Sequence, residues 1–138
     1  MIVGTGVDIV KIQRFEHWDT YSDGALAKVF HSAEVARFRF LLTVDRFKAV
    51  QFLSSRFAAK EAFFKAFCDF YRAAGVAKPR ISFLFLARSL YLEQAADGVP
   101  VIPSGVLSLV LPRQNIRASI SLAHERCCAV SSIVLSEI

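Results

Sequence analysis

The sequence predicts an α+β domain in which one long helix packs on a small antiparallel sheet. Three observations support this prediction. A strand-like pattern covers residues 2–10, helix-forming residues without Gly or Pro run from Phe47 to Ala74, and two β-rich segments near the C-terminus have the pattern of a hairpin. At 138 residues and 54% apolar composition, the chain is long enough for one core, so we expect a single domain over residues 1–138.

Composition narrows the class of protein. The formal net charge of +5 makes a polyanion or an acidic protein a plausible partner. No uncharged apolar run reaches the roughly 18 residues that a membrane-spanning helix needs, so we expect no membrane association. Cys68, Cys127 and Cys128 form neither a disulfide framework nor a zinc-binding spacing. Free thiols suit a reducing compartment, and we expect a cytoplasmic protein.

The first strand has two very different faces. Gly4, Gly6 and Asp8 share one of them, because side chains alternate along a strand. Glycine inside a strand often marks the close approach of another backbone or of a ligand. A dinucleotide-binding GxGxxG pattern would need glycine at position 9, where Ile9 stands. Asp8 is therefore either a functional carboxylate or the cap of the helix that follows.

The remaining elements follow from local pattern. A short helix is expected over Lys11–Trp18, and a second helix begins with Ser32 as N-cap and His31 as a solvated loop residue just before it. Strands are expected at Ile81–Leu86 and Ser89–Glu93, a turn at Asp97–Gly98, and either helix or strand at Gly105–Leu111. The C-terminal hairpin pairs Arg117–Leu122 with Cys128–Leu135 and leaves His124 exposed at its tip.

The long helix is apolar on almost every side, which is typical of a buried helix, and Gly75 stands where its C-terminal cap is expected. Glu61 is the exception, because it lies on the same face as Phe57 and Phe64. A lone carboxylate in such surroundings is costly and needs a cation or another partner. Two explanations stay open for Glu61: an ion pair with Lys65, one turn later in the helix, or a ligand site.

Three motifs taken together resemble a known family. They are Gly4-Thr5-Gly6-Val7-Asp8-Ile9-Val10, Arg56-Phe57-Ala58-Ala59-Lys60-Glu61-Ala62-Phe63-Phe64-Lys65-Ala66 and Ser119-Ile120-Ser121-Leu122-Ala123-His124-Glu125. In this order and spacing the chain resembles the bacterial holo-[acyl-carrier-protein] synthases, which are small trimeric 4′-phosphopantetheinyl transferases. The resemblance implies their fold, a homotrimer, and transfer of phosphopantetheine from coenzyme A to a serine of apo acyl carrier protein in fatty acid biosynthesis. The other product is adenosine 3′,5′-bisphosphate.

The resemblance also implies a metal site. Asp8 and Glu61 match the carboxylates that hold Mg²⁺ in the family and are therefore expected to be both metal ligands and catalytic residues. Magnesium prefers oxygen ligands and usually takes one or two carboxylates, with waters and substrate phosphates completing its shell. The residue that takes the serine proton stays open between Glu61 and a metal-associated water.

Further positions match the family's coenzyme A contacts. The cations concerned are Arg56, Lys60 and Lys65, which suit phosphate oxygens. The resemblance implies that His124 lies near the nucleotide, contributed from a neighbouring subunit. Gly98 and Pro100 match a Gly-Lys-Pro turn of the family, although Val99 replaces its lysine.

The helix after Asp8 resembles the segment that docks the carrier protein in the family. Arg14 is its best match, whereas Lys11 and Gln13 stand where the family often has glutamate. Lys11 and Arg14 are three residues apart and would share one helical face. We expect this face to receive an acidic surface of the carrier protein.

Two other functions compete with this interpretation. A coenzyme A or nucleotide-binding module that kept the fold but lost catalysis would be expected to lack Asp8 or Glu61, and both are present. A small RNA-binding domain would carry exposed aromatic residues among basic ones on strands. Here the aromatic residues concentrate at core spacing on helices, so we expect no nucleic-acid partner.

Overall fold

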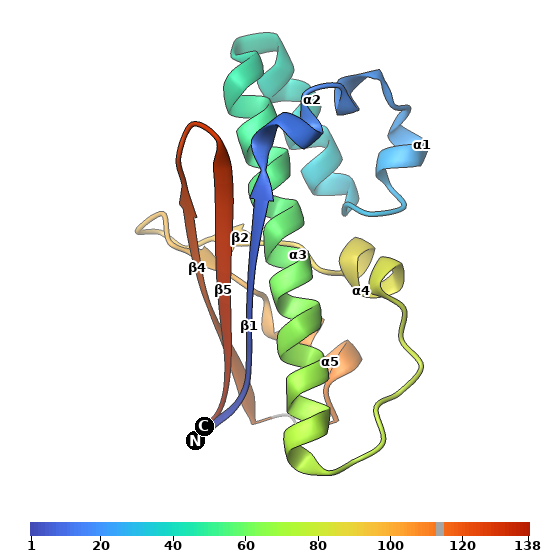
Figure 1. The fold of residues 1–138 in the computed structure, drawn as a ribbon, viewed down its shortest axis with the longest axis vertical. Helices are drawn as coiled ribbons and strands as arrows, with labels where there is room; N and C mark the ends of the chain where they lie inside the picture. Colours follow the sequence, from blue (N-terminus) through green and yellow to red (C-terminus); the bar gives the residue numbers. More distant parts are fainter. Residues whose placement is uncertain (113–114) are drawn as a thin grey trace.

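The long helix and the sheet run side by side through the molecule, as the computed structural model of residues 1–112 and 115–138 shows (Figure 1). Helix α3 (Arg46–Ala74) begins at Asp45, whose side chain accepts a hydrogen bond from the Lys48 backbone at 3.2 Å. It ends at Gly75, whose φ of 64° is the left-handed conformation that glycine adopts most readily. The predicted helix and its glycine cap are both confirmed.

The sheet has three antiparallel strands in the order β1 (Ile2–Lys11), β5 (Cys128–Glu137) and β4 (Ile116–His124). The predicted first strand and the C-terminal hairpin are thus confirmed, and each hairpin strand is longer than expected. In this register Asp8 lies opposite Ser131 of the central strand. Strands β1 and β4 form opposite edges of the sheet, which separates the residues that they carry.

Glycine allows β1 to lie directly on α3. A Cβ at Gly6 would stand 1.9 Å from the Ala62 carbonyl oxygen, and one at Gly4 would stand 2.7 Å from the Ala66 carbonyl oxygen. Real side-chain atoms never approach backbone so closely, so these positions require glycine. Of the two explanations for glycine in this strand, the structure therefore selects the close approach of another backbone.

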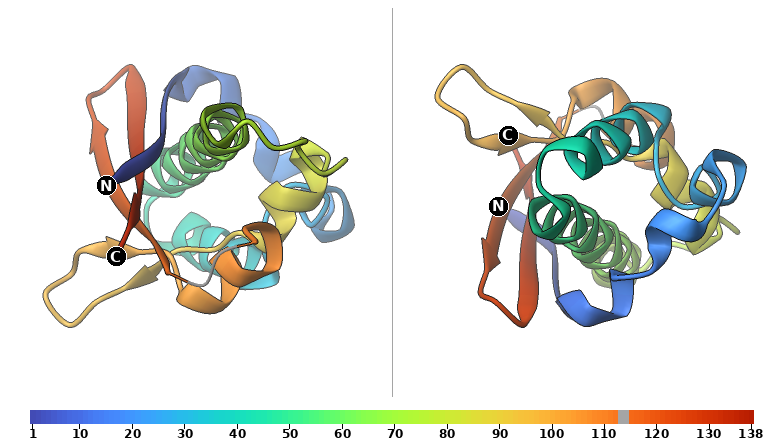
Figure 2. Two further views of the ribbon diagram at one scale, coloured as in Figure 1. Left: turned by 90° about the horizontal axis from the view of Figure 1, so that it is seen from below. Right: turned by 90° about the horizontal axis from the view of Figure 1, so that it is seen from above.

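Short elements cover the side of α3 that faces away from the sheet (Figure 2). They are the 3₁₀ helices η1 (Ile12–Phe15) and η2 (Trp18–Thr20) and the helices α1 (Asp23–Leu26), α2 (Ser32–Val44), α4 (Phe83–Ser89) and α5 (Ser104–Val110). A separate hairpin of β2 (Glu93–Gln94) and β3 (Pro100–Val101) projects outward on the β4 side. Gly98 adopts a φ of 83° in its turn, as the predicted Asp97–Gly98 turn requires.

Two apolar clusters divide the core along α3. One surrounds Phe57 and includes Phe15, Phe30 and Phe38, all of which are buried. The other surrounds Phe63 and Phe67 and joins α3 to α4, α5 and the inner face of the sheet. Because α3 contributes to both clusters, it is buried on most of its circumference.

Several predictions about the shorter elements are wrong. Ile81–Leu86 is not a strand: Ser82 caps α4 by accepting a hydrogen bond from the Phe85 backbone at 3.1 Å. The expected strand at Ser89–Glu93 reduces to β2, which starts at its last residue. The expected helix over Lys11–Trp18 is not continuous. Lys11 belongs to β1, and the rest of the segment is divided between the 3₁₀ helices η1 and η2. Gly105–Leu111, for which the sequence allows either helix or strand, is largely helical.

His31 is not a solvated loop residue. Its Nδ1 accepts a hydrogen bond from the Ala33 backbone, so His31 rather than Ser32 caps α2. The Glu34 side chain in turn accepts a hydrogen bond from the His31 backbone, which completes a capping box. The imidazole packs against the Tyr91 ring with the two centroids 4.5 Å apart.

Candidate active site

Asp8 lies on the inner face of β1, where the two glycines bring the strand onto α3. Its side chain is only 15% exposed, and its Oδ1 accepts a hydrogen bond from the Lys65 ammonium at 2.8 Å. Lys65 also donates to the Val7 carbonyl at 3.0 Å. Asp8 therefore faces the helix as a functional carboxylate would, and does not cap the segment that follows.

Glu61 faces the same place from α3, one turn before Lys65. Burial raises the pKa of Glu61, and repulsion from the Asp8 carboxylate adds to this rise. The cations of Lys65 and Arg14 act against it. Lys65 gives its ion pair to Asp8 rather than to Glu61. Of the two alternatives for Glu61, the i,i+4 ion pair within the helix therefore does not explain this half-buried carboxylate.

The donor set at this point fits a hard divalent cation. Two carboxylates repel each other across the contact between β1 and α3, and a bound cation would relieve that repulsion. Among residues 1–112 and 115–138, no cluster of three or more His, Cys, Asp or Glu side chains exists that could hold a metal alone. A metal at Asp8 and Glu61 would thus take its other ligands from water and substrate, as Mg²⁺ usually does in proteins.

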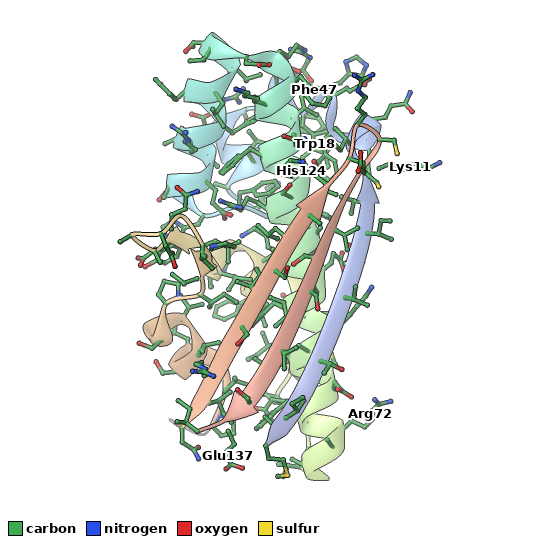
Figure 3. All side chains as sticks on the ribbon, turned by 90° about the vertical axis from the view of Figure 1, so that its left-hand side faces the viewer. Lys11, Trp18, Phe47, Arg72, His124 and Glu137 are labelled. Atoms are coloured by element: carbon green, nitrogen blue, oxygen red, sulfur yellow. The ribbon has the colours of Figure 1, made fainter. Side chains whose placement is uncertain are left out.

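Arg14 lies on η1 beside Asp8 and Glu61. Lys11 belongs to β1, so it does not share a helical face with Arg14 as expected. The Arg14 guanidinium packs over the Phe57 ring with its carbon 4.7 Å from the ring centroid. Lys11 ends β1 and lies at the hairpin-tip end of the sheet (Figure 3).

A cleft of about 1050 Å³ opens next to η1, and neither Asp8 nor Glu61 lines it. Its lining is mostly apolar with cations among it, and includes Lys11, Ile12, Phe47, Arg126, Cys127 and Cys128.

The predicted coenzyme A contacts are divided between α3, which carries Arg56, Lys60 and Lys65, and the β4 edge of the sheet. His124 ends β4 and is exposed as expected, and its Nδ1 lies 2.9 Å from the Gln51 Nε2. Gly98 and Pro100 lie on the β2–β3 hairpin, and β3 packs next to β4. One chain therefore presents Asp8 and Glu61 near one edge of the sheet, and His124 with the hairpin at the opposite edge.

Lys60 does not fit its predicted role as a phosphate ligand. Its side chain is 1% exposed, and its ammonium donates to Glu34 at 2.6 Å and to the carbonyls of Ala87 and Leu90. An ammonium has three donors, so none is left for a phosphate. Arg56 lies nearer the surface, at 13% exposure, with its Nε 4.0 Å from Glu34 Oε2.

Glu34 has a place in this region that its sequence position does not indicate. It lies in the first turn of α2, where an acidic residue is usual because it favours the helix dipole. Its contact with Lys60 joins positions 26 residues apart, which no local pattern can predict. The spacing of the capping box, His31 to Glu34, was the only local signal that Glu34 has a fixed orientation.

Comparison with known proteins places this geometry in context. Residues 4–93 match the family described as "ACPS: 4'-phosphopantetheinyl transferase superfamily". A holo-[acyl-carrier-protein] synthase of Treponema pallidum is 48% identical, over 99% of this chain and 97% of the relative. The crystal structure of holo-[acyl-carrier-protein] synthase from Neisseria meningitidis is 28% identical, with a TM-score of 0.69 over 99% of this chain and 100% of that one.

A third comparison bears on the fold alone. The Bacillus anthracis holo-(acyl-carrier-protein) synthase, solved in complex with CoA (3',5'-ADP), has 23% identity and a TM-score of 0.65. The match covers 100% of this chain and 99% of that one. Within the part of the chain that the structure describes, no helix has both the length and the apolar character needed to cross a bilayer.

Proposed function

Because this chain belongs to the holo-[acyl-carrier-protein] synthases of the 4′-phosphopantetheinyl transferase superfamily, we propose that it transfers 4′-phosphopantetheine from coenzyme A to apo acyl carrier protein. The serine Oγ of the carrier forms a bond to the phosphorus that bears pantetheine and gives its proton to Glu61 or to a water at the site. The pyrophosphate bond of coenzyme A breaks, and adenosine 3′,5′-bisphosphate leaves. The observation that carries this proposal is the pair of carboxylates, Asp8 and Glu61, that face each other where β1 meets α3.

The residues around this pair suit such a transfer. Asp8 and Glu61 would hold Mg²⁺, which when bound neutralises charge on the pyrophosphate and on the departing bisphosphate. Lys65 fixes the Asp8 carboxylate by a hydrogen bond and also contacts the backbone of β1. The buried Phe57 ring supports Arg14 beside them. Much of the catalytic effect would then come from the positioning of these charges.

Product analysis separates this proposal from a module that only binds coenzyme A. The chain is incubated with coenzyme A, Mg²⁺ and apo carrier protein, and the nucleotides are separated by chromatography. We expect adenosine 3′,5′-bisphosphate to accumulate only when carrier protein is present. Coenzyme A that binds but is never consumed would support the non-catalytic alternative.

The chain is proposed to act as a homotrimer, because the outer face of its sheet is uncovered and nearly free of charge (Figure 3). Strand alternation and register place on this face Thr5, Val7, Ile9, Ser119, Ser121, Ala123, Val130, Ser132 and Val134. The same register places the cations Lys11 and Arg117 only at its two ends. Val7 and Ile9 are 59% and 65% exposed, which is unusual for apolar residues in the middle of a strand. A neighbouring copy would also bring the residues near its β4 edge towards this copy's Asp8 and Glu61.

A charge in the middle of this face should dissociate the assembly. Ser132 lies on the central strand and is exposed, so Ser132→Lys would bury an ammonium against the neighbouring copy. In sedimentation equilibrium at micromolar concentration, we expect a trimer for the unmodified chain and monomers for this variant. Ser108→Lys makes the same change at an exposed site on α5 and should leave the trimer intact. A fully active monomer would refute the proposal.

The acidic carrier is proposed to dock on η1 and the neighbouring cleft. Arg14→Glu should raise the KM for carrier protein about tenfold and flatten its dependence on salt, because rim charges act mainly on association and are screened. The KM for coenzyme A should change little. Arg88→Glu reverses the same charge on the exposed side of α4 and serves as the control. Equal effects of Arg14→Glu on both KM values would mean that the carrier docks elsewhere.

The three cysteines, Cys68, Cys127 and Cys128, are all free thiols in the structure. We propose a cytoplasmic location for the reaction, because free thiols suit a reducing compartment.

A further inference from the structure

A buried cluster of charges joins three helices away from the carboxylate pair. Glu34 of α2 is 4% exposed, and its Oε1 accepts hydrogen bonds from the Lys60 ammonium at 2.6 Å and from the His31 backbone at 3.0 Å. Lys60 extends the cluster to the C-terminal end of α4 through the carbonyls of Ala87 and Leu90. The cluster therefore fixes the position of α2 and α4 on α3.

The second oxygen of Glu34 is placed differently. Its Oε2 lies 4.0 Å from the Nε of Arg56, which is too long for a hydrogen bond. Both atoms are buried, and neither has a hydrogen-bond partner among the described residues. Burial lowers the pKa of Arg56, and attraction to Glu34 opposes that shift. Arg56 is thus a largely desolvated cation. The Glu34 carboxylate attracts it but leaves its Nε–H without a hydrogen bond.

The surroundings of Arg56 open to a pocket. The Arg56 guanidinium lies over the Phe52 ring, with its carbon 4.6 Å from the centroid. The pocket beside it has a volume of about 280 Å³ and is lined by Glu34, Arg37, Arg56, Tyr91 and Gln94, among others. Gln94 pairs with Pro100 in the β2–β3 hairpin, so this pocket adjoins the element that carries the predicted coenzyme A contacts.

We propose that Glu34 is a positioning residue for the transfer reaction, because it holds Arg56 in the orientation that meets a phosphate of coenzyme A. This inference rests on the proposed function. One carboxylate serves two cations, Lys60 and Arg56, so the cluster carries an excess positive charge that an anion would balance. Lys60 contributes no contact to the ligand and acts as a fixed internal support.

The charge of Glu34 does more than balance the cluster. Without it, Lys60 and Arg56 would repel each other. Burial lowers the pKa of Lys60 and repulsion from Arg56 acts in the same direction, whereas Glu34 opposes both. Lys60 is held by two backbone carbonyls, so Arg56 is the side chain free to move away. Loss of the Glu34 charge should therefore displace the guanidinium from the pocket, rather than simply make the pocket more positive.

Glu34→Gln tests this directly, because it keeps the size of the side chain and removes its charge. We expect the KM for coenzyme A to rise about tenfold, with kcat and the KM for carrier protein within about twofold of the unmodified chain. The affinity for adenosine 3′,5′-bisphosphate, measured by calorimetry, should fall by a similar factor. In an Arg56→Ala background, Glu34→Gln should have no further effect on either quantity.

Two further variants separate positioning from stability. Tyr71→Phe removes a buried hydrogen bond to the Val110 carbonyl far from this pocket and should leave the KM for coenzyme A unchanged. Should Glu34→Gln fail to fold, Glu34→Leu combined with Lys60→Met replaces the buried ion pair by apolar side chains, which proteins often tolerate. This double variant removes the carboxylate that attracts Arg56 as well as the Lys60 charge that repels it, so the KM for coenzyme A should still rise, by less than in Glu34→Gln.

Three results would overturn the inference. They are tighter bisphosphate binding by Glu34→Gln, an undiminished effect of Glu34→Gln in the Arg56→Ala background, and an equal rise in KM for Tyr71→Phe. The first would show that Glu34 only weakens the positive field, the second that Glu34 does not act through Arg56, and the third that it acts through general stability. If the unmodified chain binds no coenzyme A, the proposed function fails, and this inference fails with it.

Discussion

Replacing either Asp8 or Glu61 with alanine should abolish transfer to the carrier protein while the chain stays folded. We expect a loss of about a thousandfold or more in kcat, which is the scale for removing groups that stabilise charge in the transition state. Burial and repulsion from Asp8 make the Glu61 charge unfavourable without a cation, so the metal-free Glu61→Ala chain should unfold at the same or a higher temperature.

Metal binding gives this prediction a readout that does not depend on turnover. Mn²⁺ can replace Mg²⁺ on oxygen ligands, and its binding is followed by electron paramagnetic resonance. Asp69→Ala is the matched control, because Asp69 is also an α3 carboxylate that contacts β1, through the Thr5 backbone at 2.9 Å. Unchanged Mn²⁺ binding by both Asp8→Ala and Glu61→Ala would show that the metal lies elsewhere.

Gly6→Ala should have the second large effect, because the added methyl group has no room. Its Cβ would lie 1.9 Å from the Ala62 carbonyl oxygen and 2.7 Å from the Ala66 nitrogen, and both atoms belong to the backbone of α3. The helix would have to move away from β1. We expect a loss of about 3 kcal/mol in the free energy of unfolding, towards the upper end for overpacking.

The same displacement should reduce activity, because it separates Glu61 from Asp8. Chemical denaturation gives the stability, and Gly105→Ala is the control. A Cβ at Gly105 meets no atom within 4 Å, and alanine favours the helix that this residue occupies. Gly105→Ala should therefore be neutral or slightly stabilising. An unchanged unfolding free energy for Gly6→Ala would contradict the observed contact between β1 and α3.

The elements that sequence reasoning predicted well are those with a long and regular pattern. Strand β1, helix α3 and the C-terminal hairpin each extend over nine or more residues with one consistent signal. The region around Ile81 was mispredicted because Phe and Leu are common in both strands and helices. There the decisive signal was a single capping residue, Ser82, which gives no periodicity.

The candidate site was predictable only in part, for a physical reason. Asp8 and Glu61 stood out because each carboxylate lies in an apolar or glycine-lined setting, and the resemblance to a family gave them a role. The sequence could not predict that Glu34 is the partner of Lys60, because Glu34 comes from another helix and only tertiary packing brings the two together. The resemblance therefore implied that Lys60 contacts a phosphate of coenzyme A, whereas in the structure Lys60 forms an internal ion pair with Glu34.

Intact-mass spectrometry of the carrier protein is the most direct test of the proposed transfer reaction. Apo acyl carrier protein is incubated with the chain, coenzyme A and Mg²⁺, alongside a carrier whose target serine is alanine. We expect the carrier with its target serine to gain the mass of one phosphopantetheine group and the alanine carrier to gain none. Neither carrier should gain mass when the Asp8→Ala variant replaces the unmodified chain. If the mass of the serine-containing carrier does not change with the unmodified chain, the proposed transfer reaction is contradicted.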